Sequence, residues 1–223
     1  MRMRRKKHGA ERIAACSDLL ITEYERLKDE PQFSFPKEAK LCLEIGCGKG
    51  DFACGTAANK PEINLIAMER VADVACLALE KAKAREEERD DNLRFIIGDA
   101  KNIPEWFPMH SVDCIYLNFS DPWPKEGYKK RRLTHRGFLE MYRSILVENG
   151  RLCFKTDNKG LFDFSLEEFD ACGLTVEWFT YDLHNSEHAE GNVMTEYERN
   201  FTAKGFPICS ASVVFPAKVE ETK

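Results

Sequence analysis

The sequence has no long hydrophobic run and no signature of export. None of its apolar stretches approaches the ~20 residues that a membrane-spanning helix needs. The basic start MRMRRKK leads into the polar HGAER, whereas a secretory signal would continue with an apolar core. We therefore expect a cytoplasmic protein without a membrane partner.

The nine cysteines form no CxxC pair. They are scattered through the predicted strands and helices, and the densest group, Cys42, Cys47 and Cys54, has a spacing that fits no zinc-ligand pattern. Disulfides are rare in proteins that stay in a reducing compartment. The cysteines are accordingly expected to be reduced core residues, and no metal site is predicted.

The net charge is not positive, because 33 Lys and Arg residues stand against 38 Asp and Glu residues, for a formal charge of −5. This argues against a uniformly basic nucleic-acid-binding surface. Positive charge is instead concentrated in residues 1–12 and 125–136, each with a single acid. On its own, a charge run of this kind is typical of a solvated tail or loop.

A chain of 223 residues is long enough for one α/β domain and short for two, so we predict a single domain over residues 1–223. Short apolar runs alternate with longer amphipathic stretches, as in a parallel sheet with helices on both faces. The five clearest runs are KLCLEIG, NLIAMER, LRFIIGD, VDCIYLNF and GRLCFKT. Two later strands complete a predicted seven-stranded, mostly parallel sheet.

The remaining elements follow from the same patterns. We expect helices near residues 71–89, 134–147 and 160–171, and the last two strands near 174–181 and 208–215. Thr134 is the expected N-cap of its helix. The polar segment 183–204, between the last two strands, is predicted to be a functional insertion on the substrate side.

The first strand runs into a glycine-rich turn, where open α/β sheets bind ligands. Dinucleotide sites use G-x-G-x-x-G, whereas Gly46, Gly48 and Gly50 follow G-x-G-x-G, with Glu44 two residues upstream. Glu44 would serve a phosphate poorly but could hold the ammonium group of S-adenosylmethionine. The spacing therefore favours this cofactor over NAD.

Two more acids end the next two strands. Glu69 in AMER is placed to accept both hydroxyl protons of a ribose, and Asp99 in GDA is placed to accept from the adenine amino group. Alone, each acid is equally typical of a surface residue or a helix cap. Three acids at the ends of three successive strands, beside a glycine loop, together indicate a cofactor site.

Six segments in chain order carry a resemblance to a known family: EIGCGKG, AMER, NFSDPWPK, KKRRLTHRGFL, KTDN and TEYERNFTAKGFPI. With these and its opening MRMRRK, the chain resembles the bacterial tRNA (guanine-N7)-methyltransferases from end to end. DPWPK discriminates best, because adenine and exocyclic-amine methyltransferases have N/D-P-P-Y/F at this place. The resemblance implies the Rossmann-like class I fold, with a basic N-terminal arm and helix within residues 1–30.

The resemblance also implies methyl transfer to N7 of the variable-loop guanine of tRNA, position 46 by tRNA convention, and leaves a monomer and a homodimer both open. Guanine N7 has an exposed lone pair and no proton, so SN2 transfer needs no obligatory general base. Catalysis then rests on positioning and on stabilising the positive charge that develops on the ring. Asp121 is our candidate for that role and for contact with the cofactor.

By the same resemblance, Lys125, Asp157 and the tetrad Thr195-Glu196-Tyr197-Glu198 contact the substrate. The tetrad also has the Thr-x-x-Glu pattern of a helix capping box, and the two interpretations are compatible. Phosphate contacts are expected from Lys129, Lys130, Arg131 and Arg132. The stretch Glu126-Gly127-Tyr128 is less basic than family members often are here, which bears on RNA affinity.

Prolines on both sides of Trp123 would stiffen its loop, and the less favoured alternative for this ring is packing in the core. Three other functions are open to the residues alone: a class I methyltransferase acting on another RNA base or a small molecule, a non-enzymatic RNA-binding module, and an NAD oxidoreductase. DPWPK with its basic run argues against the first. The strand-end acids argue against the second, and the glycine spacing argues against the third.

Overall fold

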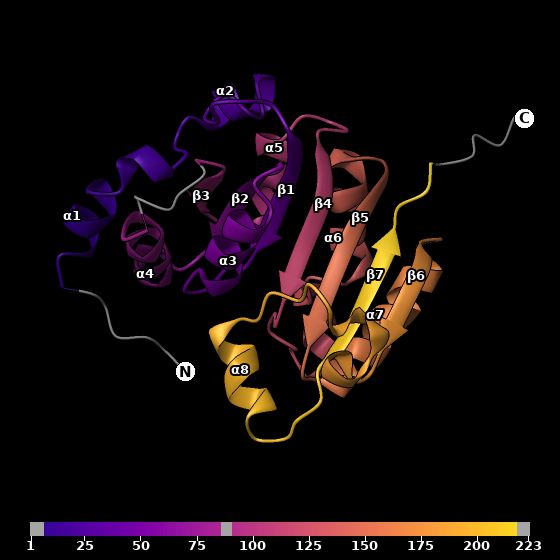
Figure 1. Ribbon diagram of the computed structural model, residues 1–223. Coiled ribbons are helices and arrows are strands. Elements are labelled where there is room, and N and C mark those ends of the chain that lie inside the picture. The colour runs from indigo at the N-terminus through magenta and orange to yellow at the C-terminus, as the bar shows by residue number, and fades with distance from the viewer. Residues whose placement is uncertain (1–6, 86–90, 218–223) are drawn as a thin grey trace, which may run out of the picture.

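The computed structural model describes residues 7–85 and 91–217. Within them, one sheet has seven strands in the order β3-β2-β1-β4-β5-β7-β6, parallel except for β7, which runs antiparallel to β5 and β6 (Figure 1). The strands are β1 (Lys40–Ile45), β2 (Ile63–Glu69), β3 (Leu93–Ile97), β4 (Val112–Asn118), β5 (Leu146–Thr156), β6 (Thr175–Thr180) and β7 (Cys209–Val214). The predicted seven-stranded, mostly parallel sheet is confirmed.

The described helices flank the sheet (Figure 1). They are α1 (Gly9–Ala14), α2 (Tyr24–Asp29), α3 (Asp51–Asn59), α4 (Ala72–Lys83), α5 (Ile103–Trp106), α6 (Arg136–Ile145), α7 (Lys159–Ala171) and α8 (Glu196–Thr202). Short 3-10 helices cover Ser17–Leu19, Ala100–Asn102, Glu126–Arg131, Leu183–Asn185 and Glu187–Ala189.

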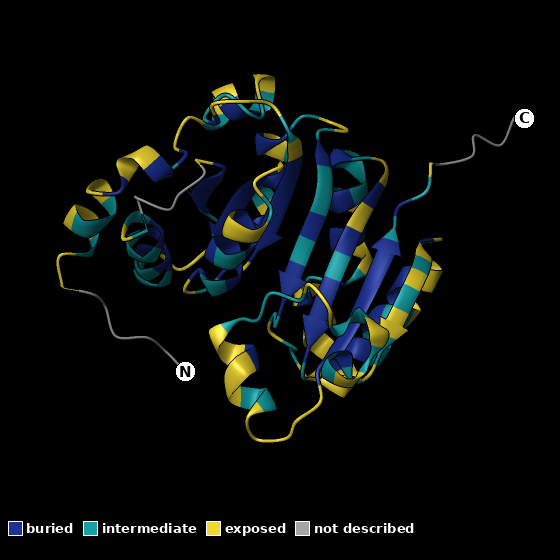
Figure 2. Cartoon of the chain, viewed as in Figure 1, coloured by how far each residue is buried: buried dark blue, intermediate teal, exposed yellow. Residues whose placement is uncertain are grey.

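Each face of the sheet has its own hydrophobic core. On one face, Leu43 of β1 packs in a cluster with Leu139 of α6 and Phe162 of α7. On the other, Cys42 of the same strand joins a cluster with Leu79 of α4. Successive strand residues point to opposite faces, so a strand that is buried on both sides is mostly apolar, as is β1, which is dark blue in Figure 2.

Two predicted helices begin or end differently from expectation. Helix α6 begins at Arg136, and its N-cap is His135, whose Nδ1 accepts a hydrogen bond from the Gly137 backbone N–H at 3.0 Å. The prediction that Thr134 caps this helix is wrong: Thr134 is fully buried, and its hydroxyl accepts from that of Ser165 at 2.7 Å. Helix α4 covers residues 72–83, and residues 86–90 of the predicted helix 71–89 lie outside the described residues.

The N-terminal basic cluster contributes in part to the fold. Arg12 of α1 donates two hydrogen bonds of 2.6 Å from Nε and Nη2 to the carboxylate of Glu80 on α4. This ion pair fastens α1 against α4, so Arg12 has a structural role. Residues 1–6, which hold most of the predicted basic arm, lie outside the described residues.

The nine cysteines are free thiols; six of them are buried, and Cys114, Cys153 and Cys172 are half-buried. In residues 7–85 and 91–217, no cluster of His, Cys, Asp and Glu side chains is arranged to hold a metal ion. None of the helices described is both long enough and apolar enough to cross a bilayer.

The segment between β6 and β7 returns across the carboxyl ends of the strands and carries α8 (Figure 1). Thr195 caps α8 by accepting from the Glu198 N–H at 2.8 Å, and the Glu198 carboxylate accepts from the Thr195 N–H at 3.3 Å. These reciprocal bonds confirm the predicted capping box. The insertion therefore meets the end of the sheet where the strand-end acids lie.

Candidate cofactor and substrate site

The glycine loop between β1 and α3 leaves its backbone open to a ligand. Gly46, Gly48 and Gly50 have φ angles of +83°, +57° and +80°, in the left-handed region that favours glycine. A Cβ on Gly46 or Gly48 would meet nothing within 4 Å, so the space beside the backbone is empty. A Cβ on Gly50 would come within 2.9 Å of the Cβ of Ala78, so this glycine permits close packing of α4.

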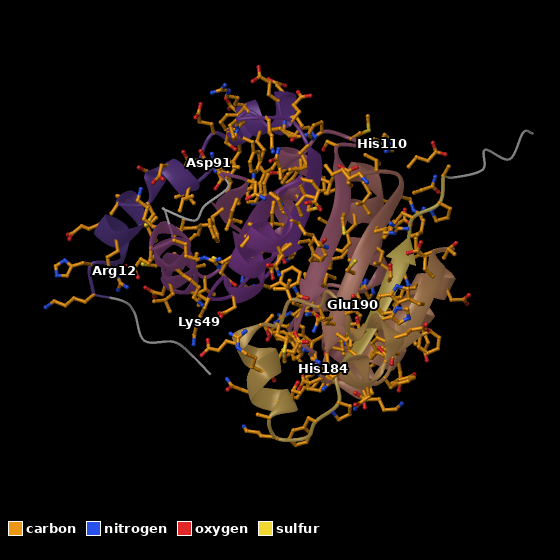
Figure 3. The ribbon with its side chains drawn as sticks, viewed as in Figure 1. Arg12, Lys49, Asp91, His110, His184 and Glu190 are labelled. Carbon is orange, nitrogen blue, oxygen red and sulfur yellow. The ribbon has the colours of Figure 1, made fainter. Side chains whose placement is uncertain are left out.

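A cavity of about 320 Å³ lies between the glycine loop and α8. Its lining includes Glu44, Phe52, Asn118 and Phe119 from the sheet side, and Tyr197 from the insertion. Figure 3 shows Lys49, from the glycine loop, at the same end of the molecule as α8, whereas His110 lies at the opposite ends of the strands, just before β4. The Lys49 ammonium pairs with the Glu196 carboxylate at 2.8 Å, and both residues line the cavity.

Glu44 is buried at the base of this cavity, with 1% of its surface exposed. Its Oε1 accepts a hydrogen bond from Nδ2 of Asn118 at 3.0 Å, while its Oε2 has no protein partner. Burial raises the pKa of Glu44 to about 7, and the Asn118 hydrogen bond and the charge of Lys155 oppose that rise. The site thus holds a carboxyl group that lacks one hydrogen-bonding partner.

A second cavity, of about 530 Å³, adjoins the first, and Gly46 and Phe119 line both. Its wall holds three predicted acids, Glu69, Asp99 and Asp121. The structure therefore places the strand-end acids around two adjoining cavities, with Glu44 at the first and the other three at the second. Because β1, β2 and β3 are neighbouring parallel strands, their carboxyl ends meet at one edge of the sheet.

Two of these acids also shape the loops. Glu69 accepts from the backbone N–H groups of Gly48 at 3.2 Å and Val71 at 2.8 Å. Asp99 accepts from the Lys101 N–H at 3.0 Å and faces the Arg70 guanidinium at 3.7 Å. The alternative interpretation of Asp99 as a helix cap is confirmed, because it is the N-cap of a 3-10 helix. This role leaves it on the cavity wall.

The loop after β4 has unusual backbone geometry. Phe119 and Trp123 have φ angles of +53° and +41°, which bulky residues rarely adopt and which cluster at functional sites. Trp123 is half-exposed on the wall of the second cavity rather than packed in the core. Asp121, two residues before it, is exposed on the same wall.

The basic run after this loop divides into side chains with different surroundings. Lys125, Lys129 and Lys130 are exposed, and Lys129 pairs with Glu126 at 2.5 Å. Arg131 is exposed, and its guanidinium lies 4.9 Å from the ring centre of Trp123. Arg132 is buried, which sets it apart from the predicted phosphate contacts.

The members of the tetrad Thr195 to Glu198 also differ in exposure. Tyr197 is exposed, donates to the Asp157 carboxylate at 3.3 Å, and packs its ring 5.1 Å from that of Phe119. Glu198, by contrast, is fully buried and pairs with Lys155 of β5 at 2.7 Å. Glu198 is therefore an anchor of α8 in this structure, whereas Thr195, Glu196 and Tyr197 line the first cavity and Tyr197 also contacts Asp157.

Sequence reasoning did not single out Asn118, Phe119 or Lys155, although each lies at the end of a strand next to a predicted residue. Asn118 and Phe119 precede Asp121 in the loop, and Lys155 precedes Asp157. Their position in the sequence could have identified them, because the last residues of β4 and β5 lie at the same end of the sheet as the glycine loop. Only tertiary contacts assign their individual partners.

S-adenosylmethionine fits the donor and acceptor set of this site. The partnerless Oε2 of Glu44 and the partnerless, buried hydroxyl of Ser120 line the two cavities, one in each. A cationic ammonium matches the first, and polar groups of the cofactor match the second. Gly46 and Gly48 leave room for a ligand that lies directly on the backbone.

Comparisons with known proteins agree on the class of protein. A sequence profile for a family described as "Putative methyltransferase" matches residues 38–211. The structure is similar to that of the 16S rRNA methyltransferase KamB, with a TM-score of 0.61 at 13% identity, over 87% of this chain and 93% of that one. A structure of an antibiotic-related methyltransferase gives 0.59 at 13% identity, over 96% and 97% of the two chains. At such identities these likenesses show the fold, which is that of class I Rossmann-like methyltransferases.

Two curated bacterial relatives are far more similar in sequence. A protein of Limosilactobacillus reuteri (strain DSM 20016), named tRNA (guanine-N(7)-)-methyltransferase, is 47% identical over 208 residues, covering 93% of this chain and 96% of that protein. A Geobacillus protein (strain WCH70) of the same name is 43% identical over 218 residues, covering 98% and 97%. The chain therefore belongs to the family of bacterial tRNA (guanine-N(7)-)-methyltransferases.

Proposed function

We propose that this protein transfers the methyl group of S-adenosylmethionine to N7 of the variable-loop guanine of tRNA. The observation that carries the proposal is the 47% identity, over nearly the full length of both chains, to a relative named for this activity. The site supports it, because the DPWPK loop places Asp121 on the wall of the space that the strand-end acids surround.

Asp121 is the proposed catalytic residue. Bound S-adenosylmethionine supplies the electrophilic methyl group, and guanine N7 attacks with a lone pair that carries no proton, so no residue has to act as a base. Positive charge develops on the guanine ring during the transfer, and a carboxylate at its edge stabilises that charge. The exposed Asp121 is free to accept from the guanine N1 and N2 protons while it does so.

The cofactor and the guanine share the connected cavities in this proposal. Glu44 holds the cationic end of the cofactor, Glu69 its ribose and Asp99 its adenine, in the order in which their strands meet the edge of the sheet. Across the cavity, Tyr197 with Phe119 presents an aromatic wall, and Asp157 lies behind it. An aromatic wall beside a carboxylate suits an extruded guanine, which stacks on its face and is held by its edge.

In this proposal the tRNA backbone is held by exposed cations that follow the Asp121 loop. Lys125 precedes the 3-10 helix Glu126–Arg131, which carries Lys129, Lys130 and Arg131, and Arg131 also lines the second cavity. Phosphate contacts of this kind position a nucleic acid without reading its sequence, so the net negative charge of the chain is no obstacle.

The test is methylation of bulk tRNA isolated from cells that lack the modification, followed by nucleoside analysis. We expect 7-methylguanosine as the new nucleoside, and none with the Asp121→Asn variant at the same enzyme concentration and time. A different methylated nucleoside, or methylation of a small molecule only, would overturn the proposal.

A further inference from the structure

Two adjacent arginines that follow the catalytic loop face in opposite directions. Arg131 is exposed and lies over the rings of Trp123 and Tyr128, at 4.9 and 4.7 Å, on the wall of the second cavity. Arg132 has 8% of its surface exposed and points inward. The two arginines therefore carry the same charge but have different surroundings.

The guanidinium of Arg132 binds the backbone of the catalytic loop. Its Nε donates to the Pro122 carbonyl and its Nη2 to the Trp123 carbonyl, both at 3.1 Å. These two parallel bonds use the planar fork of donors that only arginine provides. They grip the two residues that directly follow Asp121.

The loop needs such a grip because its conformation is unfavourable in isolation. Trp123 has a φ of +41°, a left-handed conformation that is costly for a bulky residue, and it precedes Pro124, which restricts it further. Strained residues of this kind persist only where the surrounding structure holds them in place. The bonds from Arg132 are the contacts that fix the carbonyls on both sides of the strained residue.

The Arg132 guanidinium also contacts the hydrophobic core of the protein. Its guanidinium lies 4.2 Å from the ring centre of Phe164 on α7, and Phe164 packs against the main hydrophobic cluster. The backbone carbonyl of Arg132 also accepts from the His135 N–H at 3.0 Å, at the start of α6. Arg132 thus links the catalytic loop to two helices that pack beneath the sheet.

We propose that Arg132 is a positioning residue, which sets the place of Asp121 by clamping the Pro122 and Trp123 carbonyls to α7, and that Arg131 alone of the two contacts tRNA phosphate. This inference rests on the proposed function, since its readout is the rate of methyl transfer. It reassigns Arg132 from the phosphate contacts that the sequence suggested. A displaced Asp121 slows the chemical step, because an error of about 1 Å in a catalytic group can cost on the order of 100-fold in rate.

The test compares Arg132→Ala and Arg132→Lys with the matched control Arg131→Ala. Single-turnover methylation at saturating tRNA and S-adenosylmethionine gives the rate of the chemical step, and tRNA affinity is measured across salt concentrations. For Arg132→Ala we expect a chemical step slower by at least about tenfold and an unchanged slope of log affinity against log salt. For Arg131→Ala, which removes one proposed phosphate contact, we expect weaker tRNA binding and a shallower slope, by about one unit.

Chemical rescue separates positioning from general loss of structure. Guanidinium ion at tens of millimolar is expected to restore part of the Arg132→Ala rate, whereas sodium chloride at equal ionic strength is not, and Arg131→Ala should not respond. Arg132→Lys should keep the wild-type unfolding midpoint yet stay slow, because an ammonium group lacks the planar fork.

An Arg132→Ala enzyme with wild-type rate, or one whose only defect is a shallower salt slope, would overturn the positioning role. Either result, with 7-methylguanosine still formed by wild type, would leave the proposed function intact. A wild-type enzyme that forms no 7-methylguanosine would overturn the proposed function, and this inference with it.

Discussion

We predict that the buried carboxyl group of Glu44 makes cofactor binding depend on pH. Burial raises its pKa from an ordinary value of 4.5 to about 7, so the free protein holds this group partly protonated near neutral pH. The ammonium of the cofactor interacts favourably only with the ionised form. Binding should therefore release a proton from Glu44, and affinity should rise with pH through its pKa.

The magnitude follows from the ionised fraction. With a pKa of about 7, about a tenth of Glu44 is ionised at pH ~6 and about three quarters at pH ~7.5, so affinity should fall about eightfold between the higher and the lower pH. The raised pKa of Glu44 also makes the stability of the fold depend on pH, and in the other direction: the free energy of unfolding falls as pH rises. The folded state binds the proton more tightly than the unfolded state, so this contribution is fully present below pH ~4.5 and is lost as pH rises through about 7.

A shift from 4.5 to about 7 corresponds to about 3 kcal/mol, which is an upper bound on what Glu44 costs the ligand-free protein at pH ~8. Glu44→Gln keeps the size and the acceptor for Asn118 without the charge, so it should raise the unfolding free energy at that pH while it weakens cofactor binding. Its cofactor affinity should no longer change between the two pH values.

Titration calorimetry of S-adenosylmethionine in two buffers with different ionisation enthalpies measures both the affinity and the number of protons released. We expect close to one proton released per cofactor at about pH 6 for wild type and none from this site for Glu44→Gln. A wild-type affinity that is the same at both pH values, without proton release, would refute the reasoning and return Glu44 to a structural role beside Asn118.

Three further outcomes test the remaining assignments. Asp121→Asn should slow single-turnover methylation far more than it weakens tRNA binding, with no new pH dependence between about pH 6 and 9; a wild-type rate that rises tenfold per pH unit would instead indicate a general base. Glu69→Ala should weaken cofactor binding by about 1 to 3 kcal/mol in calorimetry on the folded variant, and unchanged affinity would remove Glu69 from the site. Replacing Lys129, Lys130 and Arg131 together by Ala should weaken tRNA binding and flatten its salt dependence while cofactor affinity stays constant; an unchanged slope would mean that these side chains contact no phosphate.

The fold could be predicted because parallel strands that are buried on both faces have short, mostly apolar sequences. Each of the five runs identified in the sequence contains or overlaps one of the first five strands, and α7 and the last two strands begin within a residue or two of their predicted starts. The start of α6 was harder to predict from the sequence. Thr134 has the composition of an N-cap, but its hydroxyl bonds with Ser165 in the core, and His135 caps the helix instead. A cap preference is weaker than a buried hydrogen bond.

The candidate site could be predicted only to the level of strand ends. Acids at the carboxyl ends of neighbouring parallel strands must converge, which is why Glu69, Asp99 and Asp121 share one cavity. Whether a charged residue there faces solvent or the interior is decided by tertiary partners. Arg132 and Glu198 both belong to segments predicted to contact the substrate. In the structure both are buried, because Arg132 donates to two loop carbonyls and Glu198 pairs with a buried lysine.

The buried lysine joins the two halves of the site. Lys155 of β5 pairs with Glu198 of α8 at 2.7 Å and also donates to Asn192 Oδ1 at 2.9 Å and to the Val193 carbonyl at 3.0 Å, so it makes three hydrogen bonds to the insertion. Removing one partner of a buried ion pair typically costs about 3 to 5 kcal/mol, which makes this contact a strong determinant of where α8 lies. The charge of Lys155 acts on Glu44 as well, where it lowers the pKa. A cofactor that ionises Glu44 therefore places a negative charge beside the same cation that fixes α8 and, through it, Tyr197 on the substrate wall. We therefore expect cofactor binding and the placement of α8 to be coupled through Lys155, which interacts with both carboxyl groups.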